Sequence, residues 1–68
     1  MQEVKNARIR KGLTQLQLAE QVGVGQSAIS EIESGDMRPS IPLLVRLADV
    51  LDLDLDALVR STVALSAN

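Results

Sequence analysis

The stretch GLTQLQLAEQVGVGQSAISEIESG, residues 12–35, decides the fold of this chain, because it contains two short helical segments and little else. Thr14 is expected to cap the first helix, with Gln17 three residues later as its capping-box partner. Gly23 suits the left-handed residue that ends a helix, here after about two turns. The second segment runs from Gln26 to Ser34 and ends at Gly35. The stretch therefore predicts two helices that meet at a tight glycine turn, over about residues 14–34.

Helical signals continue on both sides of this pair. Residues 2–11 are good helix formers, and they stop at a glycine. Ser40 is expected to cap a further helix, in which Pro42 is tolerated because first-turn amides lack helical partners. Apolar residues then recur at the helical spacing i, i+3, i+4 and i+7, and these are Leu44, Leu47, Ala48 and Leu51.

Residues 51–56 alternate Leu and Asp strictly, a period that by itself is typical of a strand. A lone strand has nothing to pair with, however, and Asp54 fits the N-cap of a fifth helix from Leu55 to about Arg60. Residues 61–68 carry weak signals and are expected to fray. We therefore predict an all-α fold, a compact five-helix domain that comprises residues 1–68.

Composition excludes several classes of protein. The 68 residues suffice for one small domain, and 46% apolar with 24% charged residues is typical of a globular chain. There is no Phe, Tyr or Trp, so base-stacking modules for single-stranded nucleic acids are disfavoured. Histidine and cysteine are absent too, and no nucleophile with a matching base is evident. We expect no enzyme activity, cofactor, metal site, small-molecule ligand or membrane span, and a cytoplasmic location.

Several groups of residues between positions 3 and 60 form a recognisable pattern, and these are Gly12-Leu13-Thr14-Gln15, Leu18-Ala19, Val22-Gly23-Val24, Ser27-Ala28-Ile29-Ser30, Ile32-Glu33-Ser34-Gly35, Pro39-Ser40 and Leu44-Leu47-Ala48-Leu51. In this pattern the sequence resembles the lambda-repressor-like, Xre-type helix-turn-helix family of DNA-binding regulators over residues 3 to 60. Gly25 departs from the pattern, because the family usually has Ser or Thr there. The resemblance implies a lambda-repressor-like fold that binds double-stranded DNA.

Spacing also separates a buried face from an outward face on the second helix of the motif. Ile29 and Ile32 are expected to lock this helix onto Leu18 and Val22. Four polar residues then point outward, and they are the candidates for contact with bases: Gln26, Ser27, Ser30 and Glu31. The major groove admits one helix and presents donor and acceptor patterns that amide, hydroxyl and carboxylate groups match. A Gln26 amide suits adenine, whereas the Glu31 carboxylate suits the cytosine amino group.

Two further sets of residues are implied by the resemblance. Thr14, Gln15 and Arg38 fall at positions that contact DNA phosphates in the family. Arg8 and Glu33 correspond to a structural salt bridge that ties the first helix to the end of the reading helix. The net charge of −2 is unusual for a DNA binder, because positive charge supplies much of the affinity.

The sequence therefore predicts a sequence-specific transcriptional regulator, a small repressor that binds an inverted-repeat operator as a homodimer. Apolar residues in excess of one small core are the candidates for the dimer surface, and these are Leu43, Val45, Val50, Val59, Val63 and Leu65. An alternative stays open: an antitoxin-like module that binds a protein partner, with DNA binding secondary or absent. Negative charge and exposed apolar residues motivate this alternative.

Overall fold

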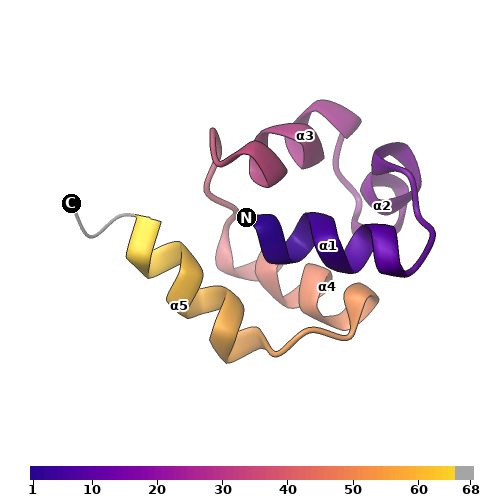
Figure 1. The fold of residues 1–68 in the computed structure, drawn as a ribbon. Coiled ribbons are helices and arrows are strands. Elements are labelled where there is room, and N and C mark those ends of the chain that lie inside the picture. Colours follow the sequence, from indigo (N-terminus) through magenta and orange to yellow (C-terminus); the bar gives the residue numbers. More distant parts are fainter. Residues whose placement is uncertain (66–68) are drawn as a thin grey trace.

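A computed structural model describes the backbone of residues 1–65 and the side chains of residues 1–63. This part of the chain contains five helices and no strand (Figure 1). The helices are α1 (Gln2–Arg10), α2 (Gln15–Val22), α3 (Gln26–Ser34), α4 (Ile41–Leu51) and α5 (Leu55–Leu65). The all-α prediction is confirmed, and the Leu-Asp alternation of residues 51–56 forms the end of α4, a turn and the start of α5 rather than a strand.

Local capping signals explain where the helices begin and end. The Thr14 hydroxyl accepts a hydrogen bond from the Gln17 amide (3.0 Å), and the Gln17 side-chain oxygen accepts one from the Thr14 amide (2.8 Å). Gly23 ends α2 with φ at +79°, a conformation that costs glycine little. The Ser40 hydroxyl accepts a bond from the Leu43 amide at the start of α4. All of these caps agree with the sequence-based expectation.

α5 is longer than the sequence predicts, because it continues past Arg60 to Leu65. Two hydrogen bonds support the extension, one to α1 and one within α5. The Ser61 hydroxyl donates to the Glu3 carboxylate on α1 (2.9 Å), and the buried Thr62 hydroxyl donates to the Leu58 carbonyl one turn earlier (3.0 Å). The expected fraying of residues 66–68 concerns positions outside the described residues.

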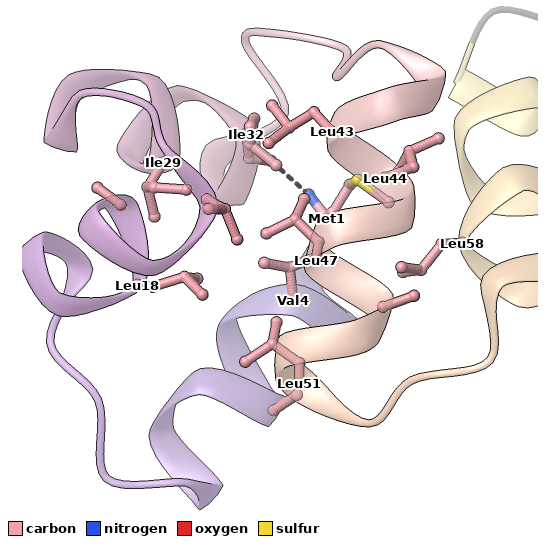
Figure 2. Close-up of a cluster of buried hydrophobic side chains, with 14 residues drawn as sticks. Met1, Val4, Leu18, Ile29, Ile32, Leu43, Leu44, Leu47, Leu51 and Leu58 are labelled. Atoms are coloured by element: carbon pink, nitrogen blue, oxygen red, sulfur yellow. Dashed lines mark hydrogen bonds between the residues drawn. The ribbon is translucent and has the colours of Figure 1, made fainter.

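The core is a single aliphatic cluster gathered around α4 (Figure 2). Its fully buried large side chains come from all five helices and are Val4, Leu18, Val22, Ile29, Ile32, Leu44, Leu47, Leu51 and Leu58. Met1 is buried as well, and its nitrogen donates to the carbonyl oxygens of Ile32 (2.8 Å) and Glu33 (3.2 Å). Leu43 belongs to this cluster with 7% of its surface exposed, so its assignment to a dimer surface was wrong.

Two sets of contacts hold the helices together, one between α2 and α3 and one centred on α4. α2 packs chiefly against α3, whereas α4 contacts α1, α2 and α5. Figure 1 shows α3 at one side of the molecule and the turn between α4 and α5 at the other, with α5 at the edge of the molecule, where it packs against α4. Because α3 rests on α1 and α2, its outer face stays uncovered.

Candidate nucleic-acid interface

The outer face of α3 is polar and open to solvent. Gln26, Ser27, Ser30 and Glu31 are all exposed, whereas Ile29 and Ile32 of the same helix are completely buried. Within the described part of the chain, the four exposed side chains form no hydrogen bond or ion pair. Their donors and acceptors therefore remain available to another molecule.

The turn between α2 and α3, which orients this face, is held by a hydrogen bond from α4. The Arg46 guanidinium of α4 donates to the Val22 carbonyl at the end of α2 (3.3 Å), directly before the left-handed Gly23. Gly25 caps α3 without a side-chain hydrogen bond, so the first amides of α3 have no side-chain partner there. The sequence did not reveal the role of Arg46, because nothing local links residue 46 to residue 22.

Thr14 and Gln15 lie at the start of α2, and both have partners within the chain. The Thr14 hydroxyl oxygen accepts from Gln17, which leaves its own hydrogen free to donate. The half-buried Gln15 donates one side-chain amide hydrogen to Glu33 Oε1 (3.1 Å). Its second amide hydrogen and its side-chain carbonyl oxygen can still form hydrogen bonds. Arg38 is exposed in the loop between α3 and α4, and it forms no ion pair with the other described residues.

Arg8 and Glu33 form a two-pronged ion pair between α1 and α3. Arg8 Nε lies 2.6 Å from Glu33 Oε2, and a terminal guanidinium nitrogen lies 3.2 Å from Oε1. Only 12% of the Arg8 side chain and 3% of the Glu33 side chain are exposed. Arg8 also donates to the Leu13 carbonyl (2.8 Å), so one guanidinium ties α1 to α3 and to the loop before α2.

The pKa of Glu33 reflects this environment. Burial acts to raise the pKa, because it disfavours the charged form. Hydrogen bonds from Arg8 and Gln15, together with the positive charges of Arg8 and Lys5, act in the opposite direction and prevail. The pKa of Glu33 therefore lies below its ordinary value, and the carboxylate is charged at neutral pH.

A polar cleft of about 330 Å³ connects these residues to α1. It is lined by Gln2 and Lys5 of α1, Gln15 of α2, and Ser30, Glu33 and Ser34 of α3. Gln15 and Ser30, which the sequence assigned separately to phosphate and base contacts, thus lie on the walls of one cleft. No local pattern identified Gln2 or Ser34 as cleft residues, because the cleft forms only where three helices meet.

Other kinds of site are not found in the described residues. Residues 1–65 contain no group of three or more acidic, histidine or cysteine side chains placed to hold a metal ion. No helix in this range is long and apolar enough to cross a membrane.

A helix-turn-helix family model matches residues 4–58, the range that covers most of α1, all of α2 to α4 and the start of α5. The chain belongs to the helix-turn-helix family. A solved structure supports the same fold. The chain is similar to one from the SinR protein/SinI protein complex, with a TM-score of 0.77 and 38% identity over 84% of this chain and 56% of that one.

Relatives of this helix-turn-helix protein are found in phages and bacteria. The chain is 36% identical over 55 residues to the ImmF control region 10 kDa protein of Bacillus phage phi105, covering 81% of this chain and 61% of the relative. It is 32% identical over 57 residues to the cryptic phage CTXphi transcriptional repressor RstR of Vibrio cholerae, covering 84% and 51%. The chain thus spans between half and two thirds of the length of these relatives.

Proposed function

We propose that this helix-turn-helix protein is a transcriptional regulator that binds double-stranded DNA, with α3 lying in the major groove. The observation that carries the proposal is the outer face of α3, whose four polar side chains are exposed and have no partners in the described part of the chain. The buried Ile29 and Ile32 hold that face rigidly against the rest of the molecule. A fixed polar helix of this kind suits direct readout of base edges.

Each residue of the interface has a proposed role. Gln26, in the first turn of α3, pairs with the N6 and N7 edge of adenine, and Glu31 accepts from a cytosine amino group. Ser27 and Ser30 contact bases on either strand. Thr14 and Gln15 bind backbone phosphates through the hydrogens that their internal bonds leave free, and Arg38 supplies a positive charge from the adjoining loop.

We further propose that the protein is a repressor that works as a homodimer in the cytoplasm. One copy of α3 contacts only a few base pairs, so an operator of useful specificity needs two half-sites about one helical turn apart. Repression then follows from occupancy, because a protein in the operator's groove excludes polymerase. The name of the similar Vibrio cholerae protein, a transcriptional repressor, supports this direction of regulation.

Selection of bound duplexes from a random DNA library tests the proposal. We expect enrichment of an inverted repeat, followed by tight binding of the enriched duplex. Gln26→Ala should then lose about 1–3 kcal/mol of discrimination at one base pair of each half-site, because a bidentate contact disappears. Gln21→Ala, an exposed glutamine on α2, is the matched control and should leave the preference unchanged. A folded protein that enriches no sequence would refute the proposal.

Protein binding is the second candidate function, and a groove beside α4 favours it. This groove of about 470 Å³ lies between α4 and the start of α5, with Val45, Leu53 and Leu55 among its lining residues. The similar SinR chain was solved in a complex with another protein. If no DNA sequence is enriched, binding of a protein partner is compared between two variants. A partner that still binds Gln26→Ala but no longer binds Val45→Asp would favour an antitoxin-like module.

A further inference from the structure

The polar cleft between α1, α2 and α3 opens beside the proposed DNA-reading face. Ser30 belongs both to the outer face of α3 and to the wall of the cleft, and Gln15 at the start of α2 forms another part of that wall. The remaining wall comes from α1, through Gln2 and Lys5. The cleft therefore adjoins the face of α3 that is proposed to contact DNA.

The charge within the cleft is positive overall once internal pairing is counted. The Glu33 carboxylate, which also lines the cleft, is paired with Arg8, and both of its oxygens already accept hydrogen bonds. Lys5 is exposed and forms no ion pair with any other described residue, although its charge is near enough to influence Glu33. Lys5 thus contributes one unbalanced positive charge at the wall of a cleft that has no unpaired negative charge.

The other polar groups of the cleft can donate as well as accept. The Ser30 hydroxyl and one amide hydrogen of Gln15 are free among the described residues. Gln2 uses one side-chain N–H on Asn6 (3.2 Å) and retains the second. Ser34 is different, because its hydroxyl hydrogen is engaged with the Glu31 carbonyl and the Asp36 carboxylate. The cleft therefore offers one cation and several hydrogen-bond donors to a small, singly charged anion.

We propose that this cleft holds a backbone phosphate of the bound DNA, with Lys5 Nζ as its principal contact and Gln2 and Ser30 as supporting donors. The inference rests on the proposed function, which it extends from α2 and α3 to α1. A phosphodiester carries one negative charge and two free oxygens, which suits one ammonium group and a few neutral donors. The contact adds affinity without base preference, because phosphates carry no sequence information directly.

Salt-dependent titration of the enriched operator tests the role of Lys5. With Lys5→Gln, the plot of log binding constant against log salt concentration should become shallower by about 0.9 for each bound subunit, the value of one phosphate contact. Binding to the operator and to unrelated DNA should weaken by the same factor. Lys5→Arg should keep the slope of the original protein.

Lys11→Gln is the matched control, since it removes the same charge from a lysine that pairs with Asp52 outside the cleft. Equal slopes for Lys5→Gln and Lys11→Gln would overturn the inference while leaving DNA binding itself established. Failure of the unaltered protein to bind any duplex would instead refute the proposed function. A thermal melt followed by circular dichroism verifies that each variant folds, as expected for an exposed lysine.

A single neutral methylphosphonate placed at successive positions of the operator identifies the phosphate. At the position that lies in the cleft, the neutral group should weaken binding by the original protein more than binding by Lys5→Gln, because Lys5→Gln has already lost the ionic contact that the neutral group removes. If the losses in binding free energy from Lys5→Gln and from the methylphosphonate are additive at every position, Lys5 acts only through long-range electrostatic attraction, and the site would be rejected.

Discussion

Glu33 joins three helices through one carboxylate. It lies on α3, accepts two hydrogen bonds from Arg8 of α1, and accepts a third from Gln15 of α2. The pairing with Arg8 was expected from the family resemblance, whereas the bond to Gln15 was not. Periodicity shows which face of a helix a side chain occupies, but the meeting of two side chains depends on how the helices cross. The prediction that Gln15 contacts a phosphate stays untested and must now accommodate this internal bond.

Replacement of Glu33 by glutamine should make the free energy of unfolding less dependent on pH in the acid range. The pKa of Glu33 is lowered by folding from an ordinary value of 4.5, so the folded state gains stability from it above that pH. This contribution is lost as the pH falls through the lower pKa of the folded state. At pH 7 we expect Glu33→Gln to reduce the free energy of unfolding by about 3 kcal/mol, because the buried Arg8 loses its charged partner.

Urea denaturation followed by circular dichroism at pH 7 and pH 3 measures this difference. The difference in free energy of unfolding between the original protein and Glu33→Gln should be large at pH 7 and smaller at pH 3. Asp52→Asn serves as the control, since Asp52 has a pKa lowered by its hydrogen bond from Lys11 but lies fully at the surface. A gap for Glu33→Gln that is the same at both pH values would contradict the assigned linkage.

At the scale of the elements, Gly23 fixes the angle between α2 and α3. A methyl group at this position would meet only the Arg46 guanidinium at 3.8 Å, which is ordinary contact, so the cost of Gly23→Ala lies in the backbone. We expect a loss of about 1 kcal/mol in the free energy of unfolding, because φ at +79° strains a residue with a Cβ atom.

Gly25→Ala provides the matched comparison in the same turn. Its φ is −77° and nothing lies within 4 Å of the added carbon, so the change in stability should stay within about 0.5 kcal/mol of zero. Thermal melts of both variants give the comparison. Equal losses at the two glycines would show that the left-handed conformation of Gly23 is unimportant.

Helix boundaries that are marked by a capping side chain or a glycine were predictable from the sequence, whereas the end of α5 was not. The caps at Thr14, Ser40 and Asp54 depend on side chains within a few residues of the amides they bind, so local sequence carries the signal. The end of α5 depends on Ser61 reaching Glu3, a residue 58 positions away. No local pattern reports such a contact, and the sequence accordingly placed the end of α5 too early.

For the whole molecule, the position of α4 explains why Leu43, a candidate for the dimer surface, lies in the core. α4 contacts three other helices, so more of its circumference is buried than the stripe of a surface helix predicts. Val50 is half-buried against the core for the same reason, whereas Val45 keeps 45% of its surface exposed. α5 lies at the edge of the molecule, where Val59 is half-buried and Val63 is 59% exposed. The side chain of Leu65 lies outside the described ones.

The edge position of α5 leads to a prediction about assembly. If α5 forms the homodimer surface, Val63→Asp should place a charge in an apolar interface and shift the sedimenting mass from two chains to one. Val45→Asp is the control, because it adds the same charge to an exposed valine on α4. Analytical ultracentrifugation with and without operator DNA gives the masses. A dimer that survives Val63→Asp but dissociates with Val45→Asp would place the interface on α4.

The four polar side chains on the outer face of α3 have no hydrogen bond within the described part of the chain. Replacing one of them removes no internal hydrogen bond, so we expect the free energy of unfolding to change by no more than about 0.5 kcal/mol. If α3 reads DNA as proposed, single base changes in the gene can alter the operator that is read without touching the buried core, so the reading face can diverge under selection faster than the helices beneath it. Related regulators would then differ in the sites they recognise and remain alike in their cores.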